Sequence, residues 1–170
     1  MVEWPQVPGA APNYQKMALK QGDPLTKPGI VGAFCRAYDI RTAMDKFLPG
    51  IYTPCIMGSE ERYTYTGGST AGGAIIYDNG KFLYSHHATD PCSMQLVNAF
   101  DLVRLHLYGD KDDSAPGNTP VSKLPSYKAM CEMAMQDSAV QAIYNKEQFA
   151  QLQADFGAIA PIPGNGPQQT

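Results

Sequence analysis

The chain has no run of about 18 consecutive apolar residues, the length that a helix needs to cross a bilayer. Its first residues also lack the basic segment and apolar stretch of a signal peptide. We therefore expect no membrane association and a cytoplasmic location, where thiols stay reduced.

Paired cysteines are missing too. The four cysteines are widely spaced and form no C-x-x-C pair, which argues against a zinc ribbon and against a disulfide framework. Cys35 and Cys131 lie in apolar helical patterns, so we expect both to be buried thiols. The sequence predicts no metal and no other cofactor.

Nucleotide-binding motifs are also absent. No G-x-x-x-x-G-K-[ST] sequence occurs, and no G-x-G-x-x-G sequence lies between a strand and a helix. Nucleotide hydrolysis and dinucleotide binding therefore have no support. The net charge of −3 at pH 7 excludes a globally basic nucleic-acid binder, although a local basic surface remains possible.

Helical patterns precede and follow a group of short strand patterns. Apolar spacing predicts helices over about residues 13–48 and 98–157, with Asp39 and Asn98 as N-caps. Segments of β-forming residues predict a sheet over about residues 51–86. The expected strands are residues 51–55, 62–66, 73–77 and 82–85. We therefore predict an α+β fold, with a small antiparallel sheet of about three to five strands flanked by helices and followed by C-terminal helices.

Both ends are rich in proline and glycine. We expect residues 1–12 to form a flexible linker and residues 158–170 a flexible tail, which leaves residues 13–157 as a single domain. With 44% hydrophobic residues, a chain of 170 residues can bury one ordinary core or two small ones. Such ends suit a piece of a longer protein, and a small complete protein with frayed ends is the alternative.

A predicted hairpin leads into a polar turn. Asn79-Gly80 separates two apolar strand segments and is typical of a two-residue type I′ turn. The second strand continues into His86, His87, Thr89 and Asp90, groups that are able to bind a metal or to act as acid and base. Neighbouring strand residues point to opposite faces, so the two histidines are not expected to share one ion.

Cys92 becomes a third metal donor only if this turn folds back on itself. A hydrogen-bonded structural corner or a phosphate contact is the preferred interpretation of the turn. His106 lies on the apolar side of its helix, where we expect a hydrogen-bonded core histidine.

A glycine-rich segment over residues 67–73 interrupts the strands. Its backbone amides are candidates for phosphate contacts, although a purely conformational role is the simpler alternative. Arginines and tyrosines alternate along the chain, and such residues contact phosphates and stack on bases when they converge. The candidate nucleic-acid-binding residues are Arg36, Arg41, Arg62, Ser69, Thr70, Gly72, Gly73, His86, His87, Thr89 and Arg104.

Five motifs occur in a familiar order. They are residues 27–38 (KPGIVGAFCRAY), 62–65 (RYTY), 69–73 (STAGG), 85–91 (SHHATDP) and 98–104 (NAFDLVR). Together they resemble the middle region of phage and mobile-element replication proteins of the virulence-associated protein E type, over about residues 12–157. In that family the region lies between a primase-polymerase domain and a helicase-like ATPase domain.

The order of elements also resembles the zinc-ribbon module of bacterial primases. The glycine-rich segment and the histidine pair stand at the two positions where that module has its pairs of metal ligands. Because those ligands are missing here, the resemblance implies a zinc-ribbon-like core without metal. A winged-helix-like core is the alternative.

The resemblance implies a noncatalytic part of a phage-type primase/helicase in a bacterial or phage-infected cell. Its expected partners are single-stranded or primer-template DNA and the neighbouring primase and ATPase domains, with no catalytic residues in this chain. Two alternatives stay open. One is a small metal-dependent phosphoesterase that uses His86, His87 and Asp90, and the other is a purely structural connector.

Overall fold

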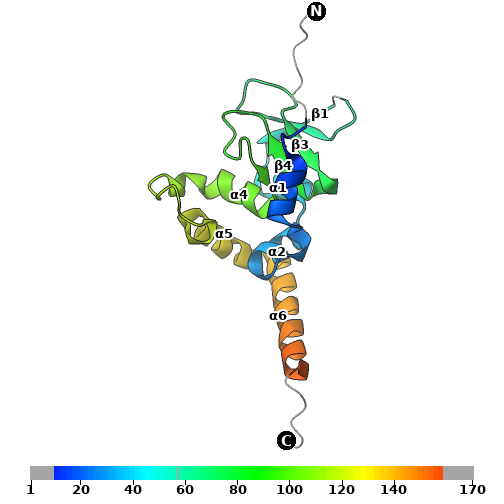
Figure 1. Ribbon diagram of the computed structural model, residues 1–170, viewed down its shortest axis with the longest axis vertical. Coiled ribbons are helices and arrows are strands. Elements are labelled where there is room, and N and C mark those ends of the chain that lie inside the picture. Colours follow the sequence, from blue (N-terminus) through cyan, green and yellow to red (C-terminus); the bar gives the residue numbers. More distant parts are fainter. Residues whose placement is uncertain (1–9, 57, 159–170) are drawn as a thin grey trace, which may run out of the picture.

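The computed structural model describes residues 10–56 and 58–158. In this part of the chain, six α-helices and five β-strands form an α+β fold (Figure 1). The helices are α1 (Tyr14–Gln21), α2 (Gly29–Ala37), α3 (Ile40–Phe47), α4 (Ala99–Tyr108), α5 (Pro125–Gln136) and α6 (Ser138–Ala158). The strands are β1 (Tyr52–Cys55), β2 (Arg62–Tyr65), β3 (Ala74–Tyr77), β4 (Phe82–Ser85) and β5 (Leu96–Val97). The predicted fold class is confirmed, whereas the likeness to a zinc ribbon or a winged helix stays a prediction.

The five strands form one antiparallel sheet in the order β1-β2-β3-β4-β5, so each strand pairs with the next along the chain. The first four strands lie where the sequence predicts them. β5 was not predicted, because two residues are too few to show an alternating pattern. It pairs with β4 through Leu83 and Val97 and adds an edge to the sheet.

The hairpin between β3 and β4 is present, but its turn differs from the prediction. Tyr77 pairs with Phe82, so the loop contains four residues rather than two. Asp78, Asn79 and Gly80 all have positive φ angles, of 53°, 54° and 94°. A type I′ turn needs only two such residues, so the extra left-handed residue lengthens the loop.

Side-chain caps define the starts of two helices, as predicted. Asp39 Oδ1 accepts the amide hydrogen of Thr42 at 2.9 Å, and the Thr42 hydroxyl accepts that of Asp39 at 3.0 Å, which forms a capping box for α3. Asn98 Oδ1 accepts the amide hydrogen of Asp101 at 2.8 Å and caps α4.

Side chains of β4 alternate between two hydrophobic clusters on the two faces of the sheet. Leu83 belongs to the main core, which α2, α3 and α4 cover with residues such as Phe100. Phe82 and Tyr84 belong to a smaller cluster that α1 covers, with Tyr14 packed edge-on against Phe82. The sheet is therefore enclosed on both faces near β4.

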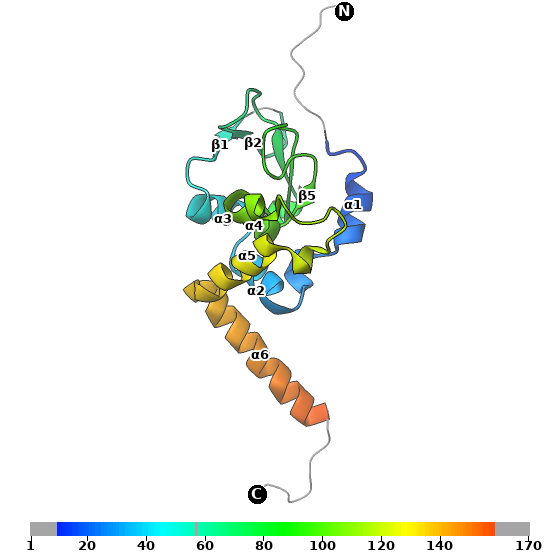
Figure 2. The ribbon, with the colours of Figure 1, turned by 90° about the vertical axis from the view of Figure 1, so that its left-hand side faces the viewer.

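The last helix leaves the body of the protein. Near its start α6 packs on α2 and α5, with Val140 buried and Glu147 paired with Arg36 at 2.5 Å. Its second half extends away from the other elements, as Figures 1 and 2 both show. Three apolar residues there are more than half exposed: Phe149, Leu152 and Phe156.

Part of the predicted N-terminal linker packs on the fold. Ala11 is buried, and its amide donates to the Tyr77 hydroxyl at 2.7 Å. Residues 1–9 and 159–170 of the predicted linker and tail lie outside the described residues. Cys35 is buried as predicted, and burial raises its pKa to about 11, while Cys131 is only half-buried. No described helix has the length and apolar character needed to cross a membrane.

Candidate functional site: a glycine loop beside a histidine turn

Two polar segments lie together at one end of the sheet. The glycine loop (residues 67–73) joins β2 to β3, and the histidine turn (residues 85–92) follows β4. Because β3 and β4 are antiparallel, Ala74 at the start of one pairs with Ser85 at the end of the other. The two segments line a pocket of about 360 Å³, formed by Gly67, Gly68, Ser69, Thr70, His86, His87, Ala88 and Thr89.

His87 joins the two segments. Its Nε2 accepts amide hydrogens from Tyr65 at 3.2 Å and Gly73 at 3.1 Å, so this nitrogen carries no hydrogen. The hydrogen of the neutral ring therefore lies on Nδ1, which is 2.9 Å from the Thr70 hydroxyl oxygen and donates to it. Burial lowers the pKa of His87 below its ordinary value, which favours the same neutral form.

The glycines of the loop allow this close approach. A Cβ atom at Gly73 would lie 2.8 Å from His87 Nε2, and one at Gly68 would lie 3.2 Å from His87 Nδ1. A methyl group at the first position overlaps the ring, so Gly73 is needed for the imidazole to accept the Gly73 amide hydrogen.

Arg62 holds the end of the loop from inside the protein. It is 5% exposed, donates to the Gly72 carbonyl oxygen at 2.9 Å and pairs with Glu60 at 3.2 Å. The Gly72 amide donates to the Thr64 hydroxyl at 2.9 Å. Two side chains of β2 thus fix the loop at Gly72, and Arg62 acts as a support rather than as an exposed cation.

The centre of the loop faces solvent. Ser69, Thr70 and Ala71 are exposed, and their amides donate to no acceptor within residues 10–56 and 58–158. These three amides, and the hydroxyl groups of Ser69 and Thr70, lie beside the pocket as available hydrogen-bond donors. Consecutive free amides of this kind are a usual way for a protein to bind an anion.

The structure gathers only part of the predicted nucleic-acid-binding set. Ser69, Thr70, Gly72, Gly73, His86, His87 and Thr89 belong to the two segments, with Arg62 behind them. The other three arginines have acidic partners elsewhere. Arg36 pairs with Glu147, Arg41 pairs with Glu61 at 2.6 Å, and the buried Arg104 pairs with Asp101 at 3.1 Å. These arginines do not form the basic surface that the sequence suggested.

The two histidines are separated, as the strand pattern predicts. The His86 ring packs against Tyr84, with 4.9 Å between ring centroids, while both His87 nitrogens bond to the glycine loop and Tyr65. Asp90 directs its carboxylate into the core instead. The Asp90 carboxylate therefore bonds to Tyr52 in the core, whereas His87, named with it for a phosphoesterase, bonds to the glycine loop.

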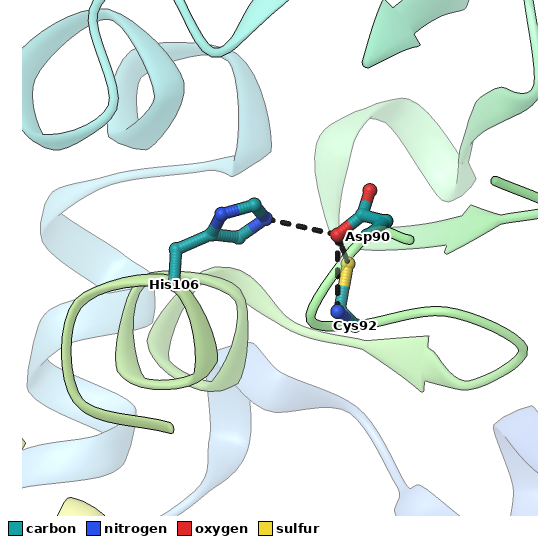
Figure 3. A group of neighbouring side chains, drawn as sticks. All are labelled: Asp90, Cys92 and His106. Carbon is teal, nitrogen blue, oxygen red and sulfur yellow. Dashed lines mark hydrogen bonds and ion pairs between the residues drawn. The ribbon is translucent and has the colours of Figure 1, made fainter. Parts of the chain in front are cut away.

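Asp90 is the centre of a second polar group, the Asp90 cluster, which comprises Asp90, Cys92 and His106 (Figure 3) together with Tyr52. The Tyr52 hydroxyl donates to Asp90 Oδ2 at 2.5 Å. The other carboxylate oxygen, Oδ1, lies 3.0 Å from the Cys92 amide, 3.1 Å from Cys92 Sγ and 3.0 Å from His106 Nε2. The turn thus folds back through Cys92, towards Asp90 rather than towards the histidine pair.

Burial alone raises the pKa of Asp90, but hydrogen bonds from His106, Tyr52 and Cys92 outweigh it and hold that pKa well below its usual range. Burial raises the pKa of Tyr52 and of Cys92 far above their ordinary values. At neutral pH the cluster therefore contains one carboxylate anion, a phenol and a thiol. The His106 side chain is buried, as predicted, but no sequence signal links it to Tyr52 and Asp90.

Comparisons of the chain with family models, with curated proteins and with solved structures give no match.

Proposed function

We propose that this chain is a noncatalytic nucleic-acid-binding module, and that the glycine loop and the histidine turn contact the phosphate backbone. The observation that carries the proposal is the set of exposed donors at residues 69–71, whose amides have no described acceptor. Backbone amides and hydroxyl groups are common phosphate contacts that position a protein without selecting a sequence. His87 and Arg62 hold these donors in place from behind.

Because the arginines pair with acidic side chains, the proposed phosphate contact depends mainly on neutral hydrogen-bond donors. Neutral donors attract phosphate less strongly than free guanidinium groups do, and the net charge is −3. We therefore expect weak binding of single-stranded or primer-template DNA. The resemblance to the middle region of virulence-associated E-type proteins supports a role beside primase and ATPase domains, which would contribute further contacts.

Fluorescence anisotropy with labelled single-stranded, duplex and junction DNA tests this proposal on the full chain at about 50 mM salt, where phosphate contacts are strongest. Ser69→Asp places a negative charge on the exposed loop and is expected to abolish binding. Ser114→Asp makes the same change in an exposed loop after α4 and is expected to leave binding unchanged. Equal binding by wild type and Ser69→Asp, or no binding of any DNA at tens of micromolar protein, would reject the proposal.

A domain-coupling role is the second candidate, and one observation favours it. Phe149, Leu152 and Phe156 follow the spacing of a single helix face, and all three are exposed. Phe149 is nine residues, about two and a half turns, after the buried Val140, so this face points away from the body. A neighbouring domain that packs on this face is the connector alternative, which predicts no dependence on Ser69.

A further inference from the structure

Four side-chain donors from three separate elements meet inside the fold in the Asp90 cluster, and Figure 3 shows three of them, Asp90, Cys92 and His106. Tyr52 comes from β1, His106 from α4, and Asp90 and Cys92 from the histidine turn. Ligand atoms of Asp90, Cys92 and His106 all lie within 4.8 Å of one another. Carboxylate, thiolate and imidazole are the three common protein ligands of zinc.

We propose that Asp90, Cys92 and His106, with Tyr52 as a neutral fourth donor, bind one zinc ion. This site is separate from the glycine loop and would hold the histidine turn to β1 and α4. The sequence suggested Cys92 only as a third donor beside the adjacent histidines, and no sequence pattern joined it to His106 or Tyr52.

The distances between the donor atoms of the Asp90 cluster would suit a tetrahedral zinc ion if the donors moved slightly apart. The Tyr52 oxygen lies 2.5 Å from Asp90 Oδ2, 2.7 Å from His106 Nε2 and 3.5 Å from Cys92 Sγ. Neighbouring ligand atoms around a tetrahedral zinc, with bonds of about 2.0–2.3 Å, are roughly 3.3–3.8 Å apart. Most donor pairs therefore need to separate by less than about 1 Å to admit the ion.

Charge and protons both balance when a zinc ion binds to this site. Without metal, the Cys92 thiol and the Tyr52 hydroxyl both donate to Asp90. When Zn²⁺ binds, the Cys92 S–H bond breaks, a zinc–sulfur bond forms and the proton is released to solvent. His106 would bind the ion through Nε2, the nitrogen that faces Asp90 and Tyr52. One carboxylate and one thiolate then neutralise Zn²⁺, as a buried site requires.

The donor set favours zinc over harder cations. A thiolate and an imidazole are poor ligands for Mg²⁺ and Ca²⁺, which take oxygen atoms. A pocket of about 430 Å³ lies beside the cluster, and His106 lines it together with Pro91, Asp110 and Asp113. The two aspartates at this pocket attract a cation to the imidazole side of the cluster.

Titration of the metal-free full chain with Co²⁺, followed by displacement with Zn²⁺, tests the proposal. We expect one equivalent of Co²⁺ to give a thiolate-to-cobalt charge-transfer band and the strong visible bands of tetrahedral cobalt. Zinc should displace the cobalt, release one proton per site near neutral pH and raise the thermal midpoint. A chain that gives no such spectrum, and whose thermal midpoint zinc does not change, would overturn the proposal.

Single substitutions test which side chains bind the zinc ion. Cys92→Ser keeps a hydrogen-bond donor beside Asp90 but removes the sulfur, so the charge-transfer band should disappear. His106→Gln should weaken zinc binding by at least about a hundredfold, the upper end of the effect of losing an outer-shell partner. Cys131→Ser, which changes the half-buried thiol of α5, should leave the spectrum unchanged. An unchanged spectrum in Cys92→Ser, with circular dichroism confirming a folded protein, would contradict the assignment.

Discussion

His87 Nε2 accepts the amide hydrogen of Gly73 at 3.1 Å, so a side chain two residues after the end of β4 holds the residue before β3. The same ring also bonds the Tyr65 amide and the Thr70 hydroxyl. One neutral imidazole therefore connects β2, β3 and the exposed part of the glycine loop. The proposed phosphate contact depends on this connection, because it orders the donors at the loop centre.

Acidification should loosen the glycine loop. The pKa of His87 is lowered in the folded chain, so the folded state favours the neutral ring. Its contribution to the free energy of unfolding is complete above the ordinary pKa of about 6.5 and is lost as pH falls through and below that value. Urea unfolding at about pH 7.5 and about pH 5.5 should show lower stability at the acidic pH, with a smaller difference in His87→Gln.

Nitrogen NMR of the histidine rings checks the protonation state behind that prediction. The His87 ring should show hydrogen on Nδ1 and none on Nε2 at neutral pH. A ring protonated on both nitrogens at neutral pH would contradict the assigned hydrogen bonds.

Gly73→Ala should destabilise the protein, because the new methyl group would lie 2.8 Å from His87 Nε2. Overpacking of this kind costs roughly 1–3 kcal/mol in the free energy of unfolding, which chemical denaturation measures. Gly117→Ala is the matched control, since a Cβ there has no neighbour within 4 Å. Equal stability of the two variants would mean that the loop lies farther from His87.

Asn98→Ala removes the cap of α4 and also a 2.9 Å hydrogen bond from Asn98 Nδ2 to Gln21 Oε1. We expect a loss of roughly 0.5–2 kcal/mol, seen as a lower thermal midpoint. Asn118→Ala, in the exposed loop before α5, should leave the midpoint nearly unchanged. A midpoint that Asn98→Ala does not lower would show that the side chain contributes little to the start of α4.

Tyr52→Phe should destabilise the metal-free protein, because the buried Asp90 carboxylate loses the donor of its Oδ2 atom. A buried group left without its partner costs about 1–3 kcal/mol, which urea unfolding detects. Tyr108→Phe, at the end of α4, removes a hydroxyl with no partner among the described residues and serves as the control. Wild-type stability in Tyr52→Phe would argue against the hydrogen-bonded form of the Asp90 cluster.

Features that depend on neighbouring residues, such as helix caps, are predicted well from the sequence. Asp39 and Asn98 stand directly before apolar helical patterns, and both cap helices in the structure. The pairing of Arg36 with Glu147 spans 111 positions in the chain, so no local pattern foretells it. The same holds for Tyr52 and His106, which meet only after the sheet and α4 have packed. The arginines were candidates for a local basic surface, but Arg36 and Arg41 pair with Glu147 and Glu61 of other segments, and Arg104 pairs with Asp101 of its own helix.

Amide NMR spectra recorded during titration with a single-stranded oligonucleotide test the central claim most directly, since each backbone amide reports its own surroundings. The account predicts that the largest shift changes occur at Ser69, Thr70 and Ala71, with smaller ones at His86 and Thr89. Saturable changes confined to Phe149, Leu152 and Phe156 of α6, or an unchanged spectrum at millimolar oligonucleotide, would contradict it.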